Sequence, residues 1–216
     1  TPKPSSAASD VYKRQKKESE KPSFSSLVAG VKYATSRKDL MGTYLVDLAA
    51  MFFAMPTALF PFWAEQAGAP WALGLFYAAG TIGSILVTLT SGWVKSYTKH
   101  GRAIFLAALG WGVAITLAGV TNNLFIILLF LILAGASDMV SALFRSTLWN
   151  QSIPDEFRGR LAGVELISYS VGPLGGQTRA GFTAERTSLR TSVVSGGLLC
   201  IGFAVSYTHL TLPTKA

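Results

Sequence analysis

Between residues 41 and 205 the sequence is a series of apolar stretches, each about as long as a helix that crosses a lipid bilayer. A spanning helix needs about 20 residues. The stretches 71–94 and 103–120 contain no charged residue at all. Six spans can be laid out, over residues 41–64, 71–94, 103–120, 124–149, 161–184 and 191 onward. The sequence therefore predicts an all-α fold, a polytopic bundle of membrane helices.

The composition supports a membrane protein. The chain is 50% hydrophobic and only 14% charged, whereas soluble domains carry about 25% charged residues. Its net charge of +8 would suit a nucleic-acid-binding protein, but the basic residues lie beside the apolar stretches. We therefore expect the lipid bilayer to be the partner, and no nucleic acid.

The two ends of the chain differ in character from the rest. Residues 5–15 read SSAASDVYKRQ and residues 205–216 read VSYTHLTLPTKA. Both resemble translations of one transposase adapter used for sequencing libraries. Codons can be chosen for residues 11–15 whose reverse complement, read in another frame, encodes the first residues of segment 205–216. We therefore leave residues 1–15 and 205–216 out of the fold argument. We expect residues 16–204 to be a piece of a longer protein, with its last span truncated.

Residues 16–40 form a basic stretch before the first span. Phe24, Leu27, Val28 and Val31 recur at helical spacing after a proline. This pattern predicts a cytoplasmic linker with a short amphipathic helix on the membrane surface. A disordered basic linker is the alternative.

Basic residues lie beside alternate ends of the spans. They are Lys16, Lys17, Lys21, Lys32, Arg37 and Lys38 before the first span, Lys95, Lys99 and Arg102 after the second, and Arg158 and Arg160 after the fourth. Cytoplasmic loops carry the excess of Lys and Arg. The N-terminal side of residues 41–204 is therefore expected inside, in the cytoplasmic membrane of a bacterium.

A few ionisable residues lie within the predicted spans. Each costs at least ~2.5 kcal/mol near the membrane centre, so such groups persist where they face a cavity or a partner. Asp138 and Arg145 are seven residues apart and share one helix face. Arg145 reaches a carboxylate on a neighbouring helix, Asp47 or Glu165, more easily than Asp138. A proton or substrate relay and a permanent salt bridge both stay open for Asp138, Arg145 and Asp47.

Other features of the spans concern their shape and end positions. Pro56, Pro61 and the pair Gly172 and Pro173 are expected to kink or open their helices. Small residues in the second, third and fifth spans suit close helix packing. For Arg179 and Glu165, near span ends, we expect the side chains to reach the interface.

Motifs of enzymes and metal proteins are absent from the sequence. It contains no His-Glu-x-x-His, Cys-x-x-Cys, Gly-x-Ser-x-Gly or phosphate-binding ATPase loop. His100 lies in a connection, His209 in the excluded tail, and Cys200 is the single cysteine. We predict no enzyme activity, no metal and no cofactor, so energy for uphill transport comes from an ion gradient or another chain.

Four segments resemble the C-terminal half of the major facilitator superfamily, closest to its siderophore exporters and "transmembrane secretion effector" proteins. They are residues 45–53 (LVDLAAMFF), 135–145 (GASDMVSALFR), 151–160 (QSIPDEFRGR) and 176–181 (GQTRAG). The resemblance implies one six-helix half of the fold, built from inverted three-helix repeats. It also implies a missing N-terminal six-helix half as partner.

Two connections resemble conserved loops of that family. Residues 92–102 (GWVKSYTKHGR) are similar to its Gly-x-x-x-Asp-Arg-x-Gly-Arg loop, with Ser96 where the carboxylate would stand. In the other, Pro154 ends one helix and Asp155 begins the next, where the positive end of the helix dipole favours it. As gating or anchoring residues we single out Gly92, Lys99, Gly101, Arg102, Pro154, Asp155, Arg158, Gly159 and Arg160. Anchoring is favoured for the second connection.

The resemblance implies a function. It predicts a secondary active exporter, coupled to protons, that moves a small amphipathic molecule, siderophore-like or drug-like, by alternating access. An uptake carrier or lipid flippase is the alternative within transport. A membrane sensor or scaffold subunit that never cycles is the alternative outside it.

Overall fold

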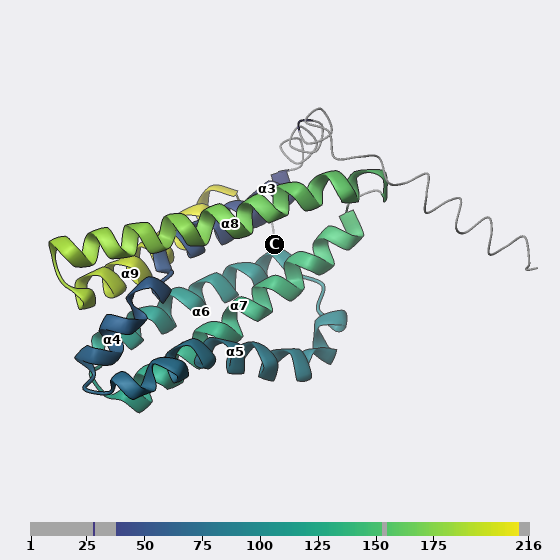
Figure 1. The fold of residues 1–216 in the computed structure, drawn as a ribbon. Helices are drawn as coiled ribbons and strands as arrows, with labels where there is room; N and C mark the ends of the chain where they lie inside the picture. Colours follow the sequence, from purple (N-terminus) through teal and green to yellow (C-terminus); the bar gives the residue numbers. More distant parts are fainter. Residues whose placement is uncertain (1–27, 29–37, 153–154, 212–216) are drawn as a thin grey trace, which may run out of the picture.

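The computed structural model describes residue 28 and residues 38–152 and 155–211, with side chains described at 28, 41–151 and 169–207. All regular elements in these ranges are helices (Figure 1). The α-helices are α3 (Lys38–Ala54), α4 (Phe60–Gln66), α5 (Leu73–Leu89), α6 (His100–Val120), α7 (Leu124–Ser152), α8 (Asp155–Arg186) and α9 (Leu189–Thr211). Short 3₁₀ turns are η1 (Thr57–Leu59), η2 (Pro70–Ala72) and η3 (Ser91–Ser96). The predicted all-α class is confirmed.

Five helical segments of the described chain are long and apolar enough to cross a membrane. They are Met41–Gln66, Pro70–Leu89, His100–Val120, Leu124–Gln151 and Leu189–Tyr207. Helix α8 is not among them, although its 32 residues make it about 48 Å long. Charged residues near both of its ends lower its apolar character. Helix α8 nevertheless packs along α3 and α9, within the bundle.

The first predicted span is broken in two. Helix α3 ends at Ala54, and Pro56 precedes the 3₁₀ turn η1. Proline has no backbone N–H to continue the helical hydrogen bonds, which accounts for the break. Pro61 lies in the first turn of α4, a position that favours proline. Pro173, in contrast, lies inside α8, which continues through it, so the helix does not open there.

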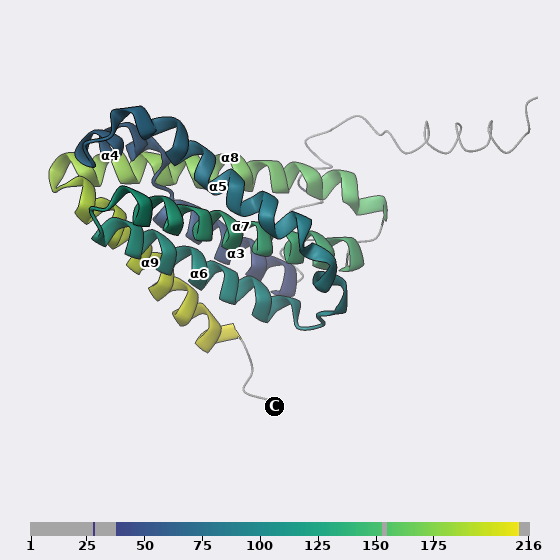
Figure 2. The same cartoon turned by 90° about the horizontal axis from the view of Figure 1, so that it is seen from below.

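The helix contacts have a two-fold pattern. Helix α7 packs against α5 and α6, and α3 packs against α8 and α9, while α6 and α9 pack against each other. Exchanging α3, α5 and α6 with α7, α8 and α9 turns the contacts of α7 into those of α3 and turns the contact between α6 and α9 into itself. In Figure 1, α8 runs along the top and α5 along the bottom, with α6 and α7 between them. Figure 2, turned by 90°, shows that α5, α7, α6 and α9 follow one another across the bundle in this spatial order. This pattern fits two three-helix repeats.

Glycines allow the closest helix contacts. A methyl group at Gly83 of α5 would overlap the backbone of Ile132 in α7, and one at Gly135 of α7 would overlap that of Gly80. Ser84 adds a hydrogen bond from its hydroxyl to the Gly135 carbonyl, 3.2 Å long. Gly176 of α8 has the same role against Met51 of α3. Close backbone packing holds helices together in lipid, where the hydrophobic effect does not.

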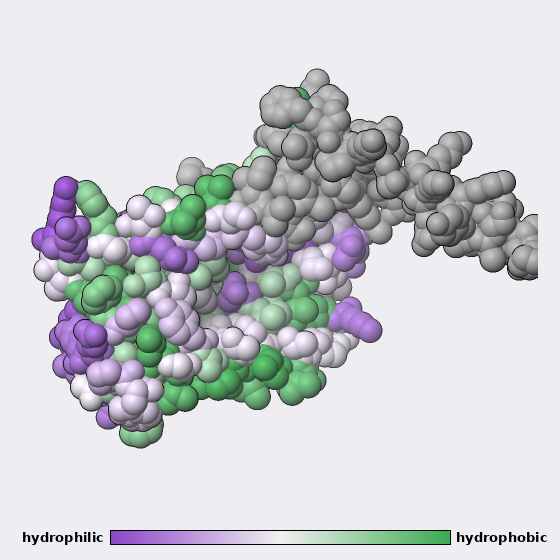
Figure 3. Space-filling view, in the orientation of Figure 1, coloured by the Kyte–Doolittle hydropathy of each residue, from purple (hydrophilic) through white to green (hydrophobic). Residues whose placement is uncertain are grey.

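Apolar side chains cover much of the outer surface. Leu75, Ile82, Ile85, Leu86 and Leu89 of α5 are exposed, and hydrophobic atoms form the lower edge of the face in Figure 3. Such a surface suits contact with lipid. Of the predicted surface helix before the first span, only Val28 is described, helical and exposed. Phe24, Leu27 and Val31 lie outside the described residues.

Candidate functional site

The central feature of the candidate site is an ion pair between two helices. The guanidinium of Arg145 in α7 pairs with the carboxylate of Asp47 in α3. Their side chains are 9% and 4% exposed. Removing two charges from water is costly, and pairing repays the cost only with good geometry and additional contacts. Asp47 is thus one of the two neighbouring-helix partners that the sequence left open for Arg145.

A third helix contributes aromatic contacts. The guanidinium carbon of Arg145 lies 5.6 Å from the ring centroid of Tyr169 in α8, a cation–π distance. Close to the pair, Tyr44 of α3 meets Trp149 of α7 edge to face, with centroids 4.9 Å apart. Arg145 therefore joins α3, α7 and α8. Its Nε atom is buried and has no hydrogen-bond partner among the described residues.

Asp138 lies two turns from Arg145, at the middle of α7. It is partly buried, and the charge of Arg145 acts on it. Within the described part of the chain Asp138 forms no ion pair. Two carboxylates, Asp47 and Asp138, thus share the influence of one guanidinium. Arg145 pairs with Asp47 here and not with Asp138.

The surface is hollowed beside this cluster. Helices α7 and α8 both pack on α3, and in the part of the chain whose side chains are described they make no extensive contact with each other. Figure 3 shows a hollow between α8 and α7 with hydrophilic atoms in it. Tyr169 and Ser170 of α8 are exposed, and Asp138 of α7 is half-buried.

The connection between α5 and α6 lies at one end of the bundle, which we call the basic end after Lys95, Lys99 and Arg102. All three side chains are exposed, as are Gly92, Ser96 and Gly101. Gly92 and Gly101 have open space around them, so neither is required by a close contact. Sequence reasoning missed a packing contact here: the rings of Trp93 and Tyr97 contact Phe144 of α7.

The second predicted connection is only partly described. Pro154 lies outside the described residues. Asp155, Arg158, Gly159 and Arg160 form the first turns of α8, but their side chains are outside the described part, as is that of Glu165. Their gating or anchoring roles stay predictions.

Arg179 of α8 does not extend toward the interface as expected. Its guanidinium lies against Gly196 of α9, close enough that a methyl group there would overlap it and the Phe53 carbonyl of α3. The side chain is half-buried, and its Nε has no hydrogen-bond partner in the described chain. The expectation was wrong because Gly196 leaves room for the guanidinium inside the bundle.

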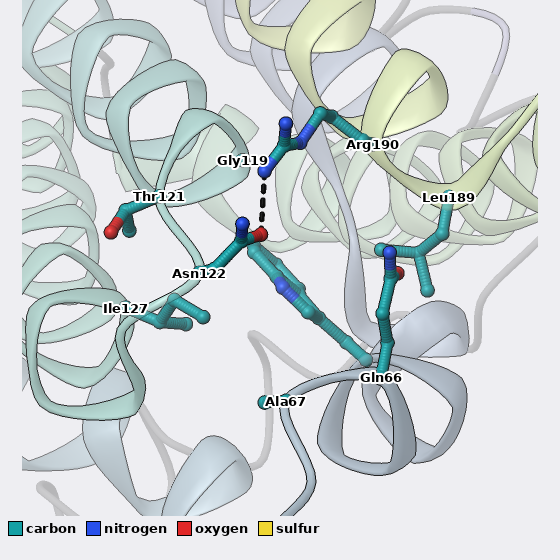
Figure 4. Close-up of a pocket in the computed structure, with 9 residues that line it drawn as sticks. Gln66, Ala67, Gly119, Thr121, Asn122, Ile127, Leu189 and Arg190 are labelled. Atoms are coloured by element: carbon teal, nitrogen blue, oxygen red, sulfur yellow. Dashed lines mark hydrogen bonds between the residues drawn. The ribbon is translucent and has the colours of Figure 1, made fainter.

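A small pocket lies at the opposite end of the bundle (Figure 4). Arg190 donates a hydrogen bond to the Asn122 side-chain oxygen, 2.5 Å away, across this pocket. Trp63 and Gln66 also line it. Its volume is about 20 Å³, which holds about one water molecule. The pocket is too small for an organic substrate.

The described residues show no metal site. No group of three or more His, Cys, Asp or Glu side chains is arranged to hold a metal ion in the described ranges. Cys200 is buried in α9, with its thiol 3.7 Å from the Ala108 carbonyl.

Comparison with known proteins gives two informative relatives. The chain is 29% identical over 179 residues to the Enterobactin exporter EntS of Shigella flexneri, covering 82% of this chain and 42% of the relative. It is 30% identical over 132 residues to the Enterobactin exporter EntS of Escherichia coli O1:K1, covering 60% of this chain and 32% of the relative.

The chain thus spans less than half the length of the curated relatives it matches. No protein-family profile matches it, and no solved structure matches it significantly. Its relatives are named as exporters and not as enzymes. The resemblance to siderophore exporters, expected from the sequence, is therefore confirmed over most of the chain.

Proposed function

We propose that the chain is the C-terminal half of a secondary active exporter in the cytoplasmic membrane. The relatives named as enterobactin exporters support export. The two-fold helix pattern supports a half built from inverted repeats, the architecture of transporters that work by alternating access. The excess of basic residues at one end supports a cytoplasmic position for that end and for the N-terminal side.

The observation that carries the proposal is the sharing of Arg145 by two carboxylates. In this conformation Arg145 pairs with Asp47, while Asp138 lies within reach of its charge. A proton that binds Asp47 neutralises this carboxylate and frees Arg145 from it, which leaves the charge of Arg145 to act on Asp138. Proton binding and release therefore change the contacts that join α7 to α3. This is a means of coupling a proton gradient to helix movement.

The substrate in this proposal is a small amphipathic organic molecule, siderophore-like or drug-like. The hollow between α7 and α8 contains hydrophilic atoms, and the ring of Tyr169 on α8 is exposed and lies against the guanidinium of Arg145. In transporters of this architecture the substrate binds near the membrane midplane, at the junction of two repeats. The other wall of the site would come from the N-terminal half.

Flux through the full-length protein tests the proposal. Reconstituted vesicles are loaded with a catecholate siderophore, and its movement is followed with and without an imposed pH gradient. Movement that depends on the gradient and runs opposite to the proton supports proton-coupled export. Flux that does not depend on the pH gradient supports a carrier of another kind. If none of the tested amphipathic molecules moves, a scaffold is supported. Residues 16–204 alone should insert but carry no flux.

A further inference from the structure

Phe144 of α7 is enclosed by aromatic rings. Its side chain is 0% exposed. Ring centroids lie 5.5 Å away for Trp93, 5.4 Å for Tyr97 and 5.8 Å for His100. Tyr97 approaches edge to face, at 67°, an arrangement that aromatic pairs favour. We call these four rings the aromatic cage.

The cage attaches the α5–α6 connection to α7. Trp93 belongs to η3, Tyr97 follows it, and His100 begins α6. Beneath the rings, Val94 and Ile104 complete a buried apolar cluster with Phe144. In the described chain this connection makes no ion pair, and Ser96 is exposed to solvent. Within the described part of the chain, ring packing is therefore what holds this connection to α7.

Phe144 and its neighbour Arg145 face different parts of the bundle. Successive residues of an α-helix are turned by about 100°. Phe144 accordingly points to the α5–α6 connection, whereas Arg145 points to Asp47 of α3 and Tyr169 of α8. Among the residues whose side chains are described, α7 contacts α3 over a short length and does not pack extensively on α8. The rotation of α7 at this level thus decides whether Arg145 reaches its partners.

We propose that Phe144 is a positioning residue for the ion pair between Arg145 and Asp47. At the basic end the cage adds to the packing of α7 on α5 and α6 and helps to fix the rotation of α7, because rotation would pull Phe144 out of the ring contacts. Arg145 is thereby held against Asp47 and Tyr169. Only the consequence for transport rests on the function proposed above, since the geometry is independent of it.

A double-mutant cycle on the full-length protein tests this inference. The variants are Phe144→Leu, Asp47→Asn and the two combined, each purified in detergent, with the thermal unfolding midpoint as the readout. Residues that share no contact normally give additive changes. If Phe144 positions Arg145, the midpoint shift caused by Asp47→Asn falls to less than half in the Phe144→Leu background. Additive shifts would overturn the inference.

The matched control is Leu133→Ala, on the same helix, where the side chain is 46% exposed. In that background Asp47→Asn should keep its full shift. If Phe144→Leu yields no folded protein, Tyr97→Leu takes its place, because it opens one wall of the cage and leaves α7 unchanged. A full Asp47→Asn shift in Tyr97→Leu would also overturn the inference. The readout is thermal unfolding and not flux, so the double-mutant cycle can be interpreted even if the proposed transport function is wrong.

Discussion

Arg145 of α7 pairs with Asp47 of α3, although Asp138 on its own helix lies only two turns away. The choice follows from helix geometry. Residues seven apart share a face but are separated by about 10 Å along the axis, whereas a neighbouring helix can present its carboxylate directly. The pair thus joins two helices that are far apart in sequence, and Asp138 keeps its carboxylate for another partner.

Loss of Asp47 should destabilise the fold more than loss of Asp138. Asp47→Asn leaves Arg145 as a buried charge without its carboxylate, and breaking a buried pair costs about 3–5 kcal/mol. Asp138→Asn breaks no ion pair in the described structure. Thermal unfolding of the purified full-length variants measures both effects.

The double variant Asp47→Asn with Arg145→Gln supplies the control for that comparison. It removes the uncompensated charge, so it should recover much of the stability lost in Asp47→Asn. Equal losses in Asp47→Asn and Asp138→Asn would show that the observed pair does not hold the fold.

At Gly135, where α7 lies closest to α5, we expect that no larger side chain is tolerated. Gly135→Val places a branched side chain against the Gly80 backbone, and overpacking typically costs about 1–3 kcal/mol. Gly74→Ala, at a position with open space, is the matched control. We expect a lower unfolding midpoint and lower yield for Gly135→Val only. Wild-type behaviour of that variant would argue against this packing.

Hydropathy and charge predicted the helices well because each helix is determined by its own residues. Spans, the helix break near Pro56 and a set of interior charges all follow from local patterns. The aromatic cage does not, because Phe144 meets rings that lie 44 to 51 residues earlier in the chain, and apolar periodicity cannot distinguish these residues from lipid-facing ones. Arg179 was misplaced for a similar reason, since the space for its guanidinium depends on Gly196 of another helix.

Cysteine labelling should separate the two ends of the bundle. In a Cys200→Ala background, single cysteines at Lys99 and Asn122 occupy exposed positions at opposite ends of α6. By the distribution of basic residues, a membrane-impermeant thiol reagent added outside the cell should label the Asn122 variant and spare the Lys99 variant. In inverted vesicles the pattern should reverse. Labelling of Lys99→Cys from outside would invert the proposed topology.

Asp138 provides the sharpest test of coupling. Its carboxylate lies at the middle of α7, within the influence of Arg145 and outside the observed ion pair. If it takes up and releases the coupled proton, Asp138→Asn in the full-length protein should abolish gradient-driven export, because the amide cannot ionise. Folding, membrane insertion and substrate binding should be largely retained, since no observed ion pair is lost. Asp138→Glu keeps an ionisable group and should keep part of the gradient-driven flux, which distinguishes a coupling role from a packing role. Normal gradient-driven export by well-folded Asp138→Asn would remove the residue from the mechanism and leave Asp47 as the remaining carboxylate of the cluster.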